Sequence, residues 1–203
     1  SRPTLDVQAS TVEVLGTVSI PIVLSEAPNG VSGFDLDVTL SDPAVASISD
    51  VQFPDFGLAE HELLSGSRAR LRAVDSEDML ESGATNAVLA TLQVRGLAQG
   101  TTEVTVRVLR LDDDSGSPME VEYKAGSLRV VSPTCPTLPG ATSPSRDMDG
   151  DARCEDINGN GRLDYDDVLE SPAVTGNAAR FDFNGNGRAD MADVVELFHL
   201  LTS

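Results

Sequence analysis

The sequence predicts a mostly β protein, with an antiparallel sandwich or jelly roll first and a small α-helical module after it. Three observations predict this. Short runs of alternating apolar and polar residues fill positions 4–131, which is typical of sandwiches and jelly rolls. Two twelve-residue stretches, beginning at Asp156 and Asp182, repeat one pattern of oxygen-bearing side chains. A proline-rich segment, 132–146, lies between the two regions.

Strands are expected where alternation places apolar side chains on one face, as Phe34, Leu36 and Val38 do. Clusters of Gly, Pro, Asn and Asp between the runs predict turns at 28–30, 42–43, 96–100 and 112–117. A short helix is expected near 75–82. The predicted strands are 17–24, 31–40, 69–73, 86–95, 102–111 and 127–131.

The segment 132–146 is interpreted as a linker, because its four prolines favour an extended, semi-rigid spacer. The predicted domains are therefore a β-sandwich at 1–131, the linker at 132–146 and the helical module at 147–203. Cys135 and Cys154 flank the junction and are the two cysteines of the chain. An even count in an extracellular chain indicates a disulfide, with two free thiols as the alternative.

The two repeated stretches match the EF-hand type of calcium loop, with oxygen donors at positions 1, 3, 5, 9 and 12 and Gly at position 6. Ca²⁺ takes about 6–8 oxygen ligands, and a glycine permits the sharp turn around the ion. Position 12 is Asp in both copies, where the general loop has Glu. The predicted ligands are Asp156, Asn158, Asn160, the Arg162 carbonyl, Asp164 and Asp167 in the first loop, and Asp182, Asn184, Asn186, the Arg188 carbonyl, Asp190 and Asp193 in the second.

A third stretch begins just before the first loop and repeats the acidic spacing with Asp147, Asp149 and Asp151. Ala152 stands where the other two copies have Gly. The sequence leaves two interpretations open: a third calcium ion shared with Asp156, or an acidic segment that holds no ion.

Each full loop should lead into a helix, at 164–170 and at 190–201, with the first ending at Ser171–Pro172. Val168 and Leu169 of the first helix are expected to pack on the second, near Phe181 and Phe183. The wide apolar stripe of the second helix is interpreted mainly as the small core of the module. Its members are Val194, Val195, Leu197, Phe198, Leu200 and Leu201.

The chain is strongly acidic, with a net charge of −19, and Lys124 is its single lysine. Nucleic-acid binding is not expected, because phosphate contacts require a basic face. Such a composition suits high salt, where self-repulsion is screened, so we expect a halophilic, for instance haloarchaeal, source. The sequence contains no run of 18 apolar residues, so it predicts no membrane-spanning helix. The chain starts as a mature or trimmed segment would. We expect an extracellular or cell-surface location.

The region 145–203 resembles a dockerin, a module of two short calcium loops without the usual entering helices. The resemblance implies that each loop is followed by one helix and that the helices bind a cohesin. Loop positions 10 and 11, which are often Ser or Thr in dockerins, are Tyr165 and Asp166 in one copy and Met191 and Ala192 in the other. The two copies also differ from each other, so we expect asymmetric docking to a partner unlike a typical bacterial cohesin.

The region 4–131 resembles a cohesin domain in the order of its pieces. The likeness lies in the strand 17–24, in 29–38 followed by Asp42–Pro43, and in 87–94 followed by Gly100-Thr-Thr. It implies a cohesin-like jelly-roll sandwich. A carbohydrate-binding sandwich is the rival interpretation, but the chain has no Trp, and Tyr123 is the only Tyr before the calcium loops.

No arrangement of side chains predicts catalysis, since His61 and His199 are the only histidines and neither has ligand or base spacing. We expect a non-catalytic, calcium-dependent assembly protein. Its partners would be cohesin-like or dockerin-like domains, including other copies of itself joined head to tail into a filament or surface lattice. The alternatives are an anchoring or scaffolding segment of a secreted hydrolase and a carbohydrate-binding module.

Overall fold

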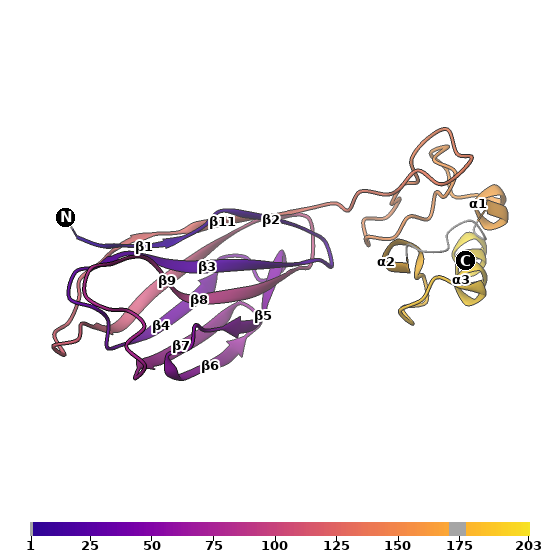
Figure 1. Ribbon diagram of the computed structural model, residues 1–203. Coiled ribbons are helices and arrows are strands. Elements are labelled where there is room, and N and C mark those ends of the chain that lie inside the picture. The colour runs from indigo at the N-terminus through magenta and orange to yellow at the C-terminus, as the bar shows by residue number, and fades with distance from the viewer. Residues whose placement is uncertain (1, 171–177) are drawn as a thin grey trace. The chain divides into compact units, whose positions relative to one another are not determined.

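The computed structural model describes residues 2–170 and 178–203, which form two compact units, Ser1–Val131 and Ser132–Ser203 (Figure 1). The first unit consists of β-strands, and the second contains the helices. Within the described residues, no helix combines the length and hydrophobicity that crossing a membrane requires. Each unit is described by itself below.

The first unit is a sandwich of two sheets, in which most neighbouring strands are antiparallel (Figure 1). One sheet has the order β10-β1-β3-β8-β5 and the other the order β2-β11-β9-β4-β7-β6. The strands of the first sheet are β10 (Glu122–Lys124), β1 (Thr4–Val7), β3 (Thr17–Ala27), β8 (Ala84–Gly96) and β5 (Ala46–Gln52). Those of the second are β2 (Ser10–Glu13), β11 (Gly126–Val131), β9 (Gly100–Asp112), β4 (Gly33–Leu40), β7 (Arg68–Asp75) and β6 (Gly57–Ser65).

The core lies between the two sheets and is aliphatic. Alternation along the strands places one set of side chains inward, so that Ile20, Ile22 and Leu24 of one sheet and Leu36 and Leu71 of the other are fully buried. These positions are the apolar members of the runs that predicted strands. The alternating pattern therefore identifies both the strands and the face that each one buries.

All six predicted strands are confirmed, as β3, β4, β7, β8, β9 and β11. The sequence analysis missed five others for identifiable reasons. β1, β2 and β10 are too short to show a period. β5 carries more polar than apolar side chains, and β6 is exposed along its whole length at a sheet edge, so burial does not select alternate residues there.

The helix predicted near 75–82 is wrong, because this segment is a bend followed by a turn. The Asp75 carboxylate accepts hydrogen bonds from the backbone N–H of Met79 at 2.9 Å and of Leu80 at 2.7 Å. Such bonds between an Asp side chain and nearby backbone compete with helical bonding. Asp78 also has a positive φ of 56°, which interrupts a right-handed helix.

The N-terminal segment contributes to both sheets. β1 pairs with β3 and β10 in one sheet, while β2 pairs in parallel with β11 in the other. Leu5 and Val7 from β1 are buried, as is Val12 from β2. Residues near the two ends of the unit therefore pair with each other, at register positions such as Ser10 with Leu128.

The described residues of the second unit include three helices, α1 (Tyr165–Glu170), α2 (Ala178–Phe181) and α3 (Met191–Thr202). The helices predicted at 164–170 and 190–201 are confirmed as α1 and α3, and α2 was missed. The predicted end of the first helix at Ser171–Pro172 lies outside the described residues. The buried core is small and comprises Leu138, Cys154, Ile157, Phe181, Phe183 and Leu197.

The segment predicted as a linker belongs to this unit over most of its length. Cys135 and Cys154 form a disulfide, and Leu138 is buried against the core. Arg146 and Asp156 exchange two backbone hydrogen bonds, of 2.9 Å and 3.2 Å. Residues 135–146 therefore cover the core as a loop that turns back on itself, with Ser145 N–H donating to the Pro136 carbonyl. We call this loop the core strap.

The apolar stripe predicted as core on the second helix is mostly exposed. Leu197 is fully buried, but Val195, Phe198 and Leu200 are exposed by 43–50% of their surface. Leu169 of α1, which was expected to pack on α3, is 75% exposed. The prediction is therefore wrong for Leu169 and for most of the stripe, because the core strap, Ile157 and two phenylalanines also fill the core. Val168 packs against this core, which includes Leu197, Phe181 and Phe183, as predicted.

Candidate functional site

The first acidic loop is organised around the Asp156 carboxylate, which is fully buried. Its two oxygens accept hydrogen bonds from the N–H groups of Asn160 (2.9 Å) and Gly161 (2.7 Å). The amide oxygen of Asn158 also accepts from Asn160 N–H, and that of Asn160 accepts from Arg162 N–H at 2.8 Å. The loop is thus tightly wound, with every second side chain turned toward its own backbone.

The second loop repeats this geometry bond for bond. Asp182 accepts from the N–H groups of Asn186 (2.9 Å) and Gly187 (2.7 Å), as Asp156 does from the equivalent residues. Asn186 accepts from Arg188 N–H at 2.8 Å. The glycines at position 6 have φ of 86° in the first loop and 83° in the second, a region that residues with a Cβ resist. The sequence repeat is therefore also a structural repeat.

The aspartates at position 12 connect each loop to its helix. Asp193 accepts from Asp190 N–H at 2.7 Å, and Asp190 accepts from Ala192 N–H, which together cap the start of α3. Asp167 does the same for α1 through Asp164 N–H at 2.8 Å and also accepts from Ile157 N–H. Burial raises the pKa of the Asp167 carboxyl above its ordinary value.

Carboxylates converge most closely in the third acidic stretch. One oxygen from each of Asp147, Asp149, Asp151 and Glu155 lies within 4.8 Å of all the others. Across residues 2–170 and 178–203, this is the one group of three or more carboxylate, His or Cys ligands that meets so closely. Hard oxygen donors in this number are the ligands that Ca²⁺ prefers. The cluster could therefore bind a metal such as calcium.

Glu155 was missing from the ligands predicted for this stretch. It occupies the position equivalent to 9 when Asp147 is position 1, and that spacing could have identified it. Its side chain is almost completely buried and accepts from Met148 N–H at 3.0 Å. Burial and, to a smaller extent, the nearby Asp149 and Asp151 charges together raise the pKa of its carboxyl to about 7, against the opposite effect of the backbone hydrogen bonds. A cation at the cluster would offset both effects.

Ala152 adopts the backbone conformation of the glycines that it replaces. Its φ is 78°, and its N–H donates to Asp147 at 3.0 Å, as Gly161 does to Asp156. The third stretch therefore keeps the turn of the other two despite the side chain. For a residue with a Cβ, this conformation costs roughly 1 kcal/mol.

On the first unit, the outer face of the β9-β4-β7-β6 side carries paired charges. Arg70 donates two hydrogen bonds to Asp35, of 2.9 and 2.7 Å, and Arg68 makes the same bidentate pair with Asp37. Each arginine holds the pKa of its partner carboxyl below the ordinary value. Both are diagonal cross-strand pairs, since the register of β4 with β7 places Asp35 opposite Arg72 and Asp37 opposite Arg70.

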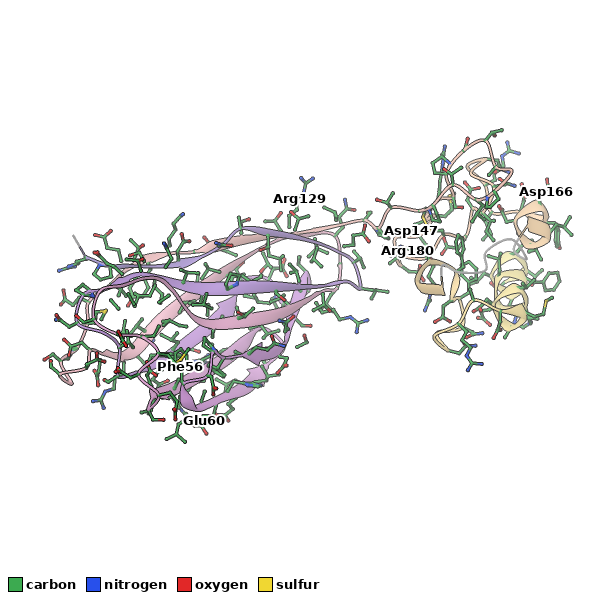
Figure 2. All side chains as sticks on the ribbon, in the orientation of Figure 1. Phe56, Glu60, Arg129, Asp147, Asp166 and Arg180 are labelled. Carbon is green, nitrogen blue, oxygen red and sulfur yellow. A yellow bond between two sulfur atoms is a disulfide. The ribbon has the colours of Figure 1, made fainter. Side chains whose placement is uncertain are left out.

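A hollow of about 650 Å³ lies at one end of the same face, beside these charged pairs. Leu58 and Val74, both more than half exposed, lie along it together with Gly33 of β4. Arg72 bridges to Glu60 at 2.8 Å beside the hollow, and Glu60 is labelled on the edge strand in Figure 2. The face therefore combines exposed apolar side chains with a charged border, which is the composition of a protein-binding surface. We call this outer face of β9, β4, β7 and β6, together with its hollow, the sandwich face.

On the second unit, exposed apolar side chains of α1 and α3 lie together. The rings of Tyr165 and Phe198 are 6.2 Å apart at their centroids. Asp166, labelled in Figure 2, adds an exposed charge beside them. We call this the helix face; its apolar members are Tyr165, Leu169, Met191, Val195 and Phe198.

Comparison with solved structures identifies the fold of the β unit. A non-cellulosomal cohesin from Archaeoglobus fulgidus matches with a TM-score of 0.54 and 17% identity, over 65% of this chain and 93% of that one. A chain from the complex of the sixth scaffoldin B cohesin of Acetivibrio cellulolyticus with a dockerin matches with a TM-score of 0.56 and 17% identity, over 64% of this chain and 100% of that one.

A chain from a type I cohesin–dockerin complex of Clostridium thermocellum gives a TM-score of 0.56 at 10% identity, over 64% of this chain and 100% of that one. Neither protein-family profiles nor curated proteins give a match to this chain. At these identities the likeness establishes the fold alone. The chain therefore contains a cohesin-like β-sandwich over about 65% of its length.

Proposed function

We propose that this chain is a non-catalytic, calcium-dependent assembly protein with a docking surface on each unit. The observation that carries the proposal is the pairing of a cohesin-like sandwich with two loops that repeat each other's hydrogen bonds. The solved cohesins to which the first unit is similar include chains in complex with dockerins. The predicted dockerin-like character of the second unit belongs to this proposal.

In this proposal, Ca²⁺ binds the two full loops through the side chains predicted from the sequence, and a third ion binds the cluster of Asp147, Asp149, Asp151 and Glu155. The donor chemistry supports it, since carboxylate and amide oxygens are the ligands that Ca²⁺ prefers. In both full loops the oxygens already fold inward along the backbone. The metal would neutralise crowded carboxylates and fix the start of α1 and α3, which couples metal binding to folding.

The helix face of one copy then binds the sandwich face of the next. Each presents exposed apolar side chains with charges beside them: Phe198 and Asp166 on the helix face, and Leu58 and Arg72 on the sandwich face. Two different surfaces make this contact heterologous, so it builds rings or open filaments. An extracellular or cell-surface location, with the disulfide retained, is consistent with such an assembly.

The test is the molar mass of the full chain by size-exclusion chromatography with light scattering, in Ca²⁺ and then in chelator. The proposal expects species larger than a monomer in Ca²⁺ and monomers in chelator. Phe198→Glu should abolish association, because it places a charge in the apolar contact. Leu97→Glu is the matched control, since Leu97 is exposed to a similar extent, 41% against 43% for Phe198, but lies on neither face. Monomers at every Ca²⁺ concentration would refute self-assembly.

Two other roles remain as alternatives. In one, the two units anchor a secreted hydrolase, and the full reading frame would then encode a catalytic domain beside this chain. In the other, the sandwich binds carbohydrate, which a glycan pull-down would detect. The chain has no Trp, and the aromatic side chain that lines the hollow, Phe34, is buried and offers no open platform for a sugar, which favours a protein partner.

A further inference from the structure

Among the described residues, the core strap forms hydrogen bonds with the first loop, whereas it meets the second through the apolar core that Leu138 shares with Phe183. Ser145, which is buried, donates from its hydroxyl to the Ile157 carbonyl at 2.8 Å. Arg146 and Asp156 exchange their two backbone hydrogen bonds one residue away. These three bonds hold positions 1 and 2 of the first loop, including the residue whose buried carboxylate organises that loop.

The disulfide fixes the other end of the strap. Cys135 is joined to Cys154, which is fully buried and precedes the first loop by two residues. Within the strap, Ser145 N–H donates to the Pro136 carbonyl at 2.9 Å, so the covalent bond and the contacts with the loop lie close together. Gly159 also packs against the Pro144 carbonyl, where even a Cβ would not fit.

In the part of the chain that the structure describes, the second loop forms no hydrogen bond with the strap. The residues directly before Asp182 form the short helix α2, which meets the cysteine region through the bond from Cys154 N–H to the Arg180 carbonyl at 2.9 Å, a bond from the Arg180 side chain to the Ala152 carbonyl at 3.5 Å, and the packing of Phe181 in the core. The two loops thus share their internal geometry but differ in what holds them from outside.

We propose that the Cys135–Cys154 disulfide sets the divalent-metal affinity of the first loop, so that a thiol reductant weakens this site selectively. The inference rests on the proposed function, because it concerns the calcium site of that loop. With the disulfide intact, the strap holds the Asp156 backbone in the metal-binding arrangement before the ion arrives. Without it, metal binding must also order the strap, and the affinity falls.

The reduction is ordinary thiol–disulfide exchange. A dithiol reductant attacks as a thiolate at the sulfur of Cys135, which is only partly buried. The sulfur–sulfur bond breaks, and the Cys154 thiolate leaves and takes a proton from solvent. The second thiol of the reductant then attacks the mixed disulfide, releasing the Cys135 thiol and an oxidised, cyclic reductant. The protein gains two electrons and two protons in total.

The experiment follows Ca²⁺ titration of the full chain by NMR at the amides of Gly161 and Gly187, with and without dithiothreitol. Each amide donates to the position-1 carboxylate of its own loop, so it reports that loop alone. Reduction should raise the Ca²⁺ midpoint at Gly161 by about tenfold or more and at Gly187 by less than about threefold. Amide hydrogen exchange should rise at Ile157 but not in the first unit, which contains no cysteine.

Two further arms separate the possible outcomes. In Cys135→Ser/Cys154→Ser, Gly161 should titrate as in the reduced chain, and dithiothreitol should change nothing. Ser145→Ala keeps the disulfide but removes the hydroxyl bond to the loop, and should raise the Gly161 midpoint by about threefold. Thr142→Ala, exposed on the same strap, is its matched control.

Equal midpoints with and without reductant would refute the inference and leave the proposed function intact. An equal loss at both loops in the reduced chain and in Ser145→Ala would refute the selectivity. No Ca²⁺ response at either glycine in the oxidised chain would instead refute the calcium loops themselves.

Discussion

The two units of this chain become compact by different means. The β unit buries a continuous aliphatic core between two sheets, with Leu36 and Leu71 among its fully buried members. Among its described residues, the helical unit has six in its buried core, one of which is a half-cystine. Small domains with little core commonly depend on disulfides or metals. The difference teaches that acidic side chains are held in separate ways here: on the sandwich face arginines pair with them, while in the loops backbone N–H groups donate to them.

Removing the metal should separate the units most clearly. In excess chelator, the melting transition of the helical unit should be lost or fall steeply, whereas that of the β unit should stay in place. At a thousandfold excess of ligand over its dissociation constant, binding stabilises by about 4 kcal/mol, a large share of the stability of a small domain. Differential scanning calorimetry of the full chain measures both transitions. If the melting transition of the helical unit were unchanged in chelator, metal binding would not distinguish its stability from that of the β unit.

Truncating one core leucine in each unit should come next in size. Leu71→Ala and Leu197→Ala each remove a fully buried side chain, and each should cost about 3 kcal/mol of unfolding free energy. The β unit should remain folded after this loss, while the helical unit should unfold even in Ca²⁺, because its core is smaller. Leu169→Ala, which alters an exposed residue of α1, should cost less than about 0.5 kcal/mol. Urea titration followed by circular dichroism compares all three.

The position-6 residues of the acidic stretches should respond in opposite directions. Ala152→Gly relieves a positive φ of 78°, so it should stabilise the metal-free helical unit by about 1 kcal/mol. Gly161→Ala imposes the same strain at a φ of 86°, and its added Cβ would meet only the end of the Arg146 side chain. It should destabilise by a similar amount. Melting temperatures in chelator and in Ca²⁺ measure both changes. If both substitutions shifted the melting temperature in the same direction, the two turns would not be equivalent.

The smallest effect concerns the sandwich face and depends on pH. Arg70 lowers the pKa of Asp35 from 3.8, so the ionised carboxylate stabilises the folded state. This contribution to the free energy of unfolding is complete above the ordinary pKa of Asp and is lost as the pH falls through the lowered pKa of the folded state. Arg70→Met should therefore lower the melting temperature of the β unit by about 2 °C at pH 7. The difference from the parent chain should shrink below pH 3.8. A constant difference down to pH 2 would indicate lost packing rather than lost charge.

Much of the β unit could be predicted from the sequence because burial selects alternate residues. The run ending at Leu40 shows the period clearly, and its strand has the expected inward face. β6 shows why other strands were missed: it is exposed at a sheet edge, so its composition carries no periodic signal. The helix expected near 75–82 failed because the Asp75 side chain bonds to the backbone that the helix would have used.

The acidic stretches were predictable as a repeat, but their surroundings were not. The spacing identified Asp156 and Asp182 as equivalent, and their hydrogen bonds are equivalent. Glu155 was absent from the predicted ligands, although it stands at position 9 of the third stretch. The exposure of Phe198 could not be inferred from its helical spacing, because that spacing does not reveal that the core strap supplies Leu138 to the core instead.

The pairing of Ser10 with Leu128 also sets when the sandwich can close during synthesis. The sandwich cannot complete its second sheet until residue 131 has left the ribosome, because its last strand pairs with β2 near the beginning of the chain. Such distant contacts make folding slow. The core of the helical unit likewise joins distant positions, since it contains both Leu138 and Leu197. Neither unit can therefore close its core until its own last element has been made.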